Sequence, residues 1–157
     1  SFNDREITIN DGIGYIEGDR GRSFPEQYAW TQYLGCEDTP VSLMLSVADI
    51  PLYGIKFKGV ICVILWEGRE YRLATYLGAR VVSIENGKIT IKQKNLTFTA
   101  ELLERNELEL KAPVFGAMRR FIRENPLCTA RYTLMEDQEV IFDFITDRAS
   151  FEFEYRV

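Results

Sequence analysis

Acidic and aromatic side chains alternate near the start of the chain, at a spacing that could place them around one ligand. Two sets of three stand at alternate positions: Tyr15, Glu17 and Asp19, then Tyr28, Trp30 and Gln32. Side chains two residues apart share a face of a β-strand, so each set would lie on one side of its strand. A carboxyl that faces an apolar cavity has a raised pKa and can donate a proton, while aromatic faces can stabilise a nearby positive charge.

These two sets define a candidate site. Glu17 and Asp19 are the candidate catalytic acids. The candidate ligand-binding residues come from the same strand faces and from the turn between them: Tyr15, Arg22, Ser23, Tyr28, Trp30 and Gln32. If both faces point into a barrel, the interior of that barrel is aromatic with a few polar groups, which is how small-molecule pockets are usually built.

The same residues also allow a purely structural interpretation. Trp30 would then belong to the core, and the carboxylates would lie in solvent. Asp19 and Arg22 would pair and fix the turn, and Ser23 would close that turn through its hydroxyl. Ser23 is not expected to be a nucleophile, because the chain has no histidine to activate it. The sequence alone leaves both interpretations open.

Composition excludes several classes of function. The 157 residues include no histidine, which excludes Ser-His-Asp and Cys-His nucleophiles and every histidine-ligated metal site. The glutamates of residues 101–110 alternate with leucines as on the outer face of a strand, and no calcium-binding loop accompanies them, so we expect no metal and no cofactor. The net charge of −5 argues against nucleic-acid binding, which needs a basic surface.

Cysteine usage and apolar runs bear on the location of the protein. Cys36, Cys62 and Cys128 are far apart, odd in number and form no C-x-x-C pair, which favours reduced thiols and a cytoplasmic protein. No apolar run reaches the roughly 18 residues that cross a bilayer, so we expect no transmembrane segment. The chain begins without methionine, and we expect it to be trimmed or to be the C-terminal part of a longer protein.

Hydrophobic patterning predicts an all-β, mainly antiparallel fold in a single domain over residues 1–157. Alternating segments bounded by turn residues predict about eleven short strands, the first of them at 7–9 and 13–17. Residues 57–66 are nearly all apolar, which predicts a strand covered on both faces, and Asn86-Gly87 predicts a type I′ hairpin turn. So many strands would remove their edges by forming a lipocalin-like β-barrel or split barrel.

The hydrophobic period changes at residues 114–124. Apolar side chains there recur at helical spacing: Val114, Ala117, Met118, Phe121 and Ile122. Pro113 suits a first helical turn, and Asn125-Pro126 suits a helix end. The pattern predicts one short helix near 114–124.

The stretch "GYIEGDRGRSFPEQYAWTQ", residues 14–32, resembles the signature of the tocopherol cyclase family, which runs roughly G-Y-I-E-x-[DN]-W-G-x-S-F-P-x-x-[WY]-x-W-x-Q. The shared Gly, Pro, acidic and aromatic positions cover about an eighth of the chain. Arg20 stands where the family pattern has Trp, and "YLGCED" replaces an Asn-containing stretch after Gln32.

The resemblance implies a lipocalin-like antiparallel barrel and kinship with enzymes that close the chromanol ring of vitamin E precursors without a cofactor. Such an enzyme, an intramolecular lyase or isomerase, protonates a prenyl double bond and traps the resulting cation with a phenolic oxygen. The resemblance therefore implies a hydrophobic, isoprenoid-type ligand. Glu17 or Asp19 would then supply the proton, and Tyr28 and Trp30 would steady the cation.

Three functions remain open from the sequence. The chain could be a cofactor-independent cyclase, hydratase or isomerase, which needs a carboxyl buried against a cavity. It could be a non-catalytic lipocalin-like carrier, which tolerates its carboxylates in solvent. It could also be a structural module that packs on an N-terminal domain of the same protein, which predicts a filled interior and an exposed apolar patch.

Overall fold

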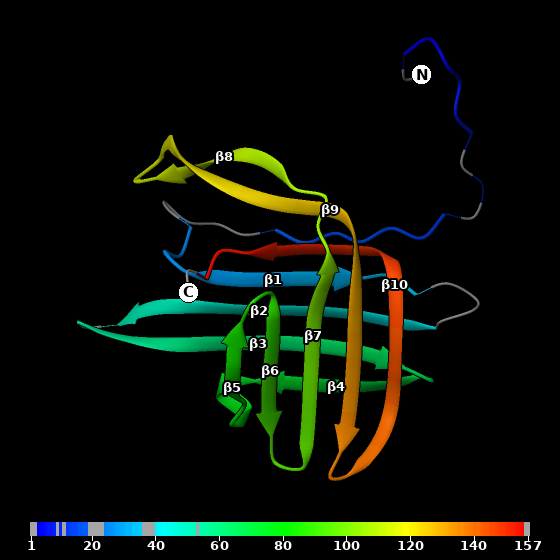
Figure 1. Cartoon of the computed structure of the whole chain (residues 1–157), viewed down its shortest axis with the longest axis vertical. Helices are drawn as coiled ribbons and strands as arrows, with labels where there is room; N and C mark the ends of the chain where they lie inside the picture. The colour runs from blue at the N-terminus through cyan, green and yellow to red at the C-terminus, as the bar shows by residue number, and fades with distance from the viewer. Residues whose placement is uncertain are drawn as a thin grey trace.

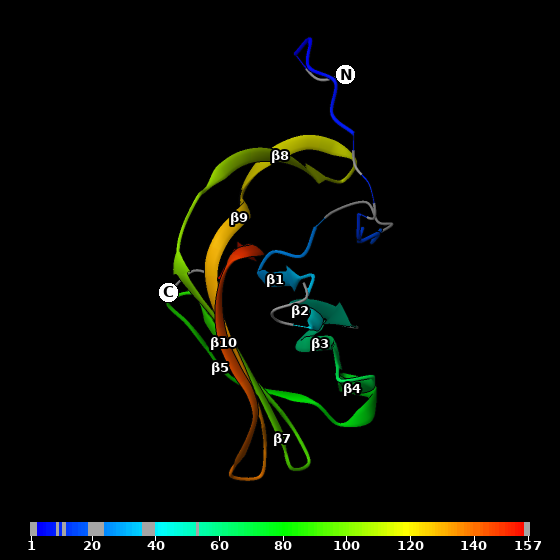
Figure 2. The ribbon, with the colours of Figure 1, turned by 90° about the vertical axis from the view of Figure 1, so that its right-hand side faces the viewer.

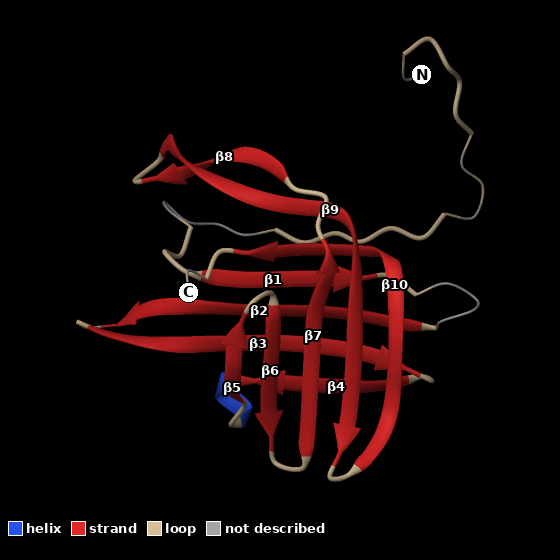
Figure 3. Cartoon of the chain, viewed as in Figure 1, coloured by secondary structure: helices blue, strands red, loops and turns tan. Residues whose placement is uncertain are grey.

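The computed structural model describes residues 3–8, 10, 12–18, 24–35, 40–52 and 54–155. Within this part of the chain nearly all regular structure is β (Figure 3). The elements are β1 (Tyr28–Tyr33), β2 (Val41–Leu52), β3 (Ile55–Trp66), β4 (Arg69–Ala74), the short 3-10 helix η1 (Thr75–Leu77), β5 (Arg80–Glu85), β6 (Lys88–Gln93), β7 (Leu96–Glu104), β8 (Leu108–Val114), β9 (Ala117–Glu136) and β10 (Glu139–Phe153).

The ten strands form one antiparallel sheet. Their order is β4-β3-β2-β1-β10-β9-β7-β6-β5, and β8 pairs with β9 beside this path. Each of β1 to β4 pairs with its neighbour in sequence, whereas β1 pairs with β10 from the other end of the chain. The sheet does not close between β4 and β5, so the all-β prediction is confirmed in its split-barrel form (Figure 1).

The sheet folds over itself because β9 and β10 are long and bent. In Figure 1, β1 to β4 run across the view while β5 to β7 and the lower parts of β9 and β10 run along it. Figure 2 shows the two sets of strands facing one another. The register of the β9–β10 pair shifts on both sides of Ala149, where β10 leaves one set for the other. Such irregularities bend a strand.

The space between the two sets of strands is filled by side chains. Tyr132 of β9 lies at its centre, with its ring stacked on that of Phe98 (centroids 6.3 Å apart) and close to those of Tyr33 (6.3 Å) and Phe144 (5.6 Å). Its hydroxyl lies 2.5 Å from Oγ1 of Thr31, which is also fully buried. The interior is therefore a packed apolar core with aromatic rings at its centre.

The predicted helix at 114–124 is wrong. Val114 ends β8, Phe115 and Gly116 form a hairpin turn in which both have positive φ, and residues 117–124 are the first part of β9. Alternation also fits the sequence, because Ile122 is buried on the same face as Ala112. Pro113 is tolerated because β8 lies beside the main path, paired with β9. Long-range pairing with β10 extends β9 through the predicted helix end.

Three strand predictions have different outcomes. Among the described residues of 7–9 and 13–17, none lies in a strand. In β3 the faces differ, because Cys62 and Ile64 are buried while Ile61 and Leu65 are exposed, so the prediction of two covered faces is wrong. The Asn86-Gly87 turn is confirmed, with φ values of 50° and 82°. In the part of the chain that is described, we find no helix with the length and apolarity needed to cross a bilayer.

Candidate functional site

The candidate site lies on the outer face of the sheet. On β1, Ala29, Thr31 and Tyr33 point into the core. Tyr28 and Trp30 therefore lie on the opposite face, and the idea that they look into a barrel interior is wrong. The hydrophobic effect favours this orientation of β1, because both sets of strands bury their apolar residues on the face that carries Ala29, Thr31 and Tyr33.

Neighbouring strands supply further side chains to this outer face. Trp30 is paired with Ser46 of β2 on one side and with Glu152 of β10 on the other. Tyr28 is paired with Ala48. Residues that pair directly across antiparallel strands present their side chains on the same face, so all five line one surface.

A hollow of about 400 Å³ opens on this surface. Described residues before β1, among 15–18 and 24–25, form its other wall, and residues 12–18 run between β1 and the β8–β9 hairpin in Figure 1. The described residues that line the hollow include no lysine or arginine: Tyr15, Glu17, Gly18, Phe24, Pro25, Tyr28, Trp30, Ser46, Ala48 and Glu152. The lining thus combines four aromatic rings with two carboxyl groups.

Glu17 is fixed against the aromatic wall. Its Oε2 accepts hydrogen bonds from the indole Nε1 of Trp30, at 3.0 Å, and from the hydroxyl of Tyr15. The Glu17 side chain remains exposed to solvent. These contacts join the stretch before β1 to the strand itself, so Glu17 has a positional role whatever chemistry it performs.

Among the described residues, Glu152 is the carboxyl with the most unusual environment. The Tyr28 hydroxyl donates a 2.7 Å hydrogen bond to its Oε2. Burial raises the pKa of Glu152 to about 7, and repulsion from Glu124, Glu154 and Glu17 acts in the same direction, while the Tyr28 hydrogen bond lowers it. Burial also raises the pKa of Tyr28 far above its ordinary value. Near neutral pH, both the acid and the carboxylate form of Glu152 are populated.

The structure brings together four of the residues singled out from the sequence, Tyr15, Glu17, Tyr28 and Trp30. Gln32 shares the outer face of β1 but does not line the hollow. The remaining candidates, Asp19, Arg22 and Ser23, lie outside the described residues.

Sequence reasoning missed Glu152. The alternation in "SFEFEY" does separate Glu152 and Glu154 from Phe151 and Phe153, and it indicates an outward-facing carboxylate. The pairing of β10 with β1 turns that outer position into the floor of a hollow. This pairing is long-range and leaves no signal in a single sequence.

The two described cysteines have a structural role. Cys62 and Cys128 are buried free thiols, and burial raises the pKa of Cys128 to about 11, which keeps it protonated and a poor nucleophile. Among the described residues, no group of three or more Cys, Asp or Glu side chains is arranged to hold a metal ion.

Comparisons of the chain with protein-family models, with curated proteins and with solved structures found no match.

Proposed function

We propose that this protein binds a hydrophobic, isoprenoid-type small molecule in the outer-face hollow and that Glu152 serves there as a proton donor. The observation that carries the proposal is the meeting of four aromatic rings with a carboxyl whose pKa is about 7. Binding sites are commonly apolar hollows with a few polar groups, and catalytic acids commonly have pKa values near the working pH.

The reaction that fits is cofactor-independent ring closure of a prenylated phenol, which agrees with the tocopherol cyclase-like signature of residues 14–32. The acid form of Glu152 gives its proton to one carbon of the double bond and becomes a carboxylate. The phenolic oxygen then bonds to the tertiary cation, and its proton returns to Glu152. Tyr28 and Trp30 line the hollow, and their ring faces would stabilise the cation. Atoms are conserved, so the step is an isomerisation.

The test is turnover and binding of a prenylated quinol by the protein and by Glu152→Gln. The glutamine can still accept the Tyr28 hydrogen bond, so the fold and the hollow should persist. We expect binding, followed by quenching of Trp30 fluorescence, to change little, while conversion to the chromanol falls by about 10²–10⁴-fold. Trp30→Phe separates the signal of Trp30 from that of Trp66. Full turnover by Glu152→Gln would exclude Glu152 as the acid.

A non-catalytic carrier is the second candidate. It is favoured by the aromatic lining of the hollow, because a carrier needs shape and apolar contact but no buried acid. In that case the wild-type protein binds the prenylated quinol and forms no chromanol at any pH. A cytoplasmic location belongs to the same proposal and is supported by the free thiols of Cys62 and Cys128.

A further inference from the structure

The β8–β9 hairpin exposes several large apolar side chains to solvent. Five of its large apolar side chains are exposed: Leu108, Leu110, Phe115, Met118 and Phe121. Leu110 is paired with Ile122 and Phe121 with Lys111, so apolar groups lie on both faces of the hairpin. A protein that leaves so much apolar surface exposed usually uses it for an interaction.

Phe115 occupies the tip of the hairpin in a backbone conformation that suits other residues better. Its φ is 50°, a value at which Asn, Asp and Gly are preferred, and its side chain is 88% exposed. Residues held in unfavourable backbone conformations are often found where function requires the side chain.

The end of the β2–β3 hairpin lies beside this tip. Ile50 and Lys56 line, together with Val114 and Phe115, a second hollow of about 510 Å³. Ile55, close to the β2–β3 turn, is 72% exposed. We call the β8–β9 hairpin, together with residues 50–51 and 54–57, the hairpin end of the molecule.

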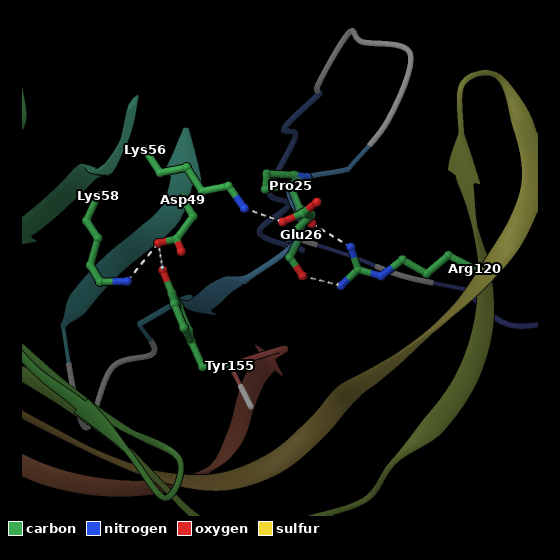
Figure 4. Close-up of polar contacts among 7 residues, drawn as sticks. All are labelled: Pro25, Glu26, Asp49, Lys56, Lys58, Arg120 and Tyr155. Atoms are coloured by element: carbon green, nitrogen blue, oxygen red, sulfur yellow. Dashed lines mark hydrogen bonds and ion pairs between the residues drawn. The ribbon is translucent and has the colours of Figure 1, made fainter. Parts of the chain in front are cut away.

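Polar contacts hold the two parts of the hairpin end in place (Figure 4). Arg120 of β9 donates hydrogen bonds to the carbonyl oxygens of Pro25, at 2.5 Å, and of Glu26, at 2.9 Å. The carboxylate of Glu26 in turn pairs with Lys56 of β3. Lys58 and Tyr155 both contact Asp49 of β2. These contacts connect the β8–β9 hairpin to residues 25–26 and, through Glu26, to β3, so they fix the position of the exposed apolar side chains.

Charge distinguishes this end from the rest of the chain. Residues 108–124 contain four basic and two acidic side chains, whereas the whole chain has a net charge of −5. Arg120 and Arg123 form ion pairs with Glu154 and Glu107, and Lys56 and Lys58 form ion pairs with Glu26 and Asp49. Lys111 and Arg119 carry the remaining positive charge of the hairpin. Exposed apolar side chains interspersed with basic ones are typical of segments that bind the surface of an anionic membrane.

We propose that the hairpin end docks on an anionic lipid bilayer, with Phe115 and Ile55 inserted among the lipid headgroups. A bilayer surrounds a projecting tip and so can cover both faces of the hairpin, whereas a flat protein surface would cover one. Insertion stays shallow, because β8 has β9 as its strand partner in the described sheet and its other edge needs water or headgroups for its backbone groups.

Vesicle flotation of the protein tests this docking. The vesicles contain phosphatidylcholine alone or phosphatidylcholine with about 30% phosphatidylglycerol. We expect binding to the anionic vesicles, weakened by added salt. Phe115→Asn should lower the partition coefficient about tenfold while leaving the fold intact or stabilised, since asparagine suits the positive φ. Val140→Asn, which also replaces an exposed apolar side chain but lies at the β9–β10 turn, should bind as the wild type does.

The charge contribution is tested with Lys111→Gln combined with Arg119→Gln, which should reduce binding to anionic vesicles and its dependence on salt. Failure of the wild-type protein to float with either vesicle would overturn the proposal, as would equal loss for Phe115→Asn and Val140→Asn. Sedimentation without vesicles addresses other occupants of the surface. The wild-type protein could fail to bind vesicles and instead self-associate in a way that Phe115→Asn abolishes. That result would overturn membrane docking and indicate that the hairpin end binds a second copy of the chain.

Discussion

Tyr28 donates a 2.7 Å hydrogen bond to Glu152 although 124 positions separate them in the chain. The contact exists because the first and last strands of the described sheet, β1 and β10, are neighbours. It places a buried carboxyl on the floor of an aromatic hollow, and the proposed chemistry depends on that placement.

The first prediction concerns the stability of the fold as a function of pH. The pKa of Glu152 rises from 4.5 to about 7 on folding, so folding favours the protonated form. Its contribution to stability is complete below pH 4.5 and is lost as the pH rises through 7, by up to about 3 kcal/mol. The glutamine of Glu152→Gln does not titrate. Urea unfolding should therefore show that the unfolding free energy of this variant increases relative to that of the wild type between pH 5 and pH 8. A constant difference in unfolding free energy over this range would contradict the raised pKa.

The second prediction concerns the buried pair of Thr31 and Tyr132. Thr31 donates its hydroxyl proton to the carbonyl of Ser150, at 2.8 Å, so it must accept the hydrogen bond of Tyr132. Tyr132→Phe removes a donor and leaves no donor unsatisfied, which should cost about 1 kcal/mol. Thr31→Val leaves the buried Tyr132 hydroxyl without its acceptor and should cost about 2–3 kcal/mol. Chemical denaturation of both variants measures the order, and the reverse order would refute this assignment of donor and acceptor.

The third prediction distinguishes the hairpin from a helix at residues 114–124. Asn125 is buried, donates to the carbonyl of Phe151 at 3.0 Å and accepts from the backbone N–H of Asn106 at 2.8 Å. Asn125→Ala removes both bonds and should destabilise the protein by about 2–3 kcal/mol. In a helix that ends at Asn125, the same change would cost little. Unfolding experiments should therefore show a large loss, and a loss below about 0.5 kcal/mol would argue against the strand.

Local signals in the sequence predicted much of the fold. Asn86-Gly87 can adopt positive φ at both turn positions, and the turn forms where expected. Phe115-Gly116 adopts a similar turn without such a signal, because phenylalanine rarely occupies that backbone conformation. The apolar spacing of 114–124 fits a helix and a twisted strand almost equally, and pairing with a distant strand decided between them.

The candidate site is only partly predictable from the sequence, because it too depends on pairing between distant strands. The alternation of Tyr28 and Trp30 correctly predicts that both lie on one face of β1. Which face of the sheet forms the core depends on all the strands together, and the alternation of one strand does not specify it. Glu152 joined the site only through the pairing of β1 with β10.

The fourth prediction, and the most direct test of the account, is where a ligand binds. Native mass spectrometry of the protein purified from cells should detect a bound apolar small molecule or, after incubation, a prenylated quinol. Ala48→Trp fills the outer-face hollow and should abolish the bound mass, whereas Gln138→Trp, at the exposed β9–β10 turn, should retain it. Equal retention by both variants, or no uptake by the wild-type protein, would contradict the assignment of the hollow as a binding site.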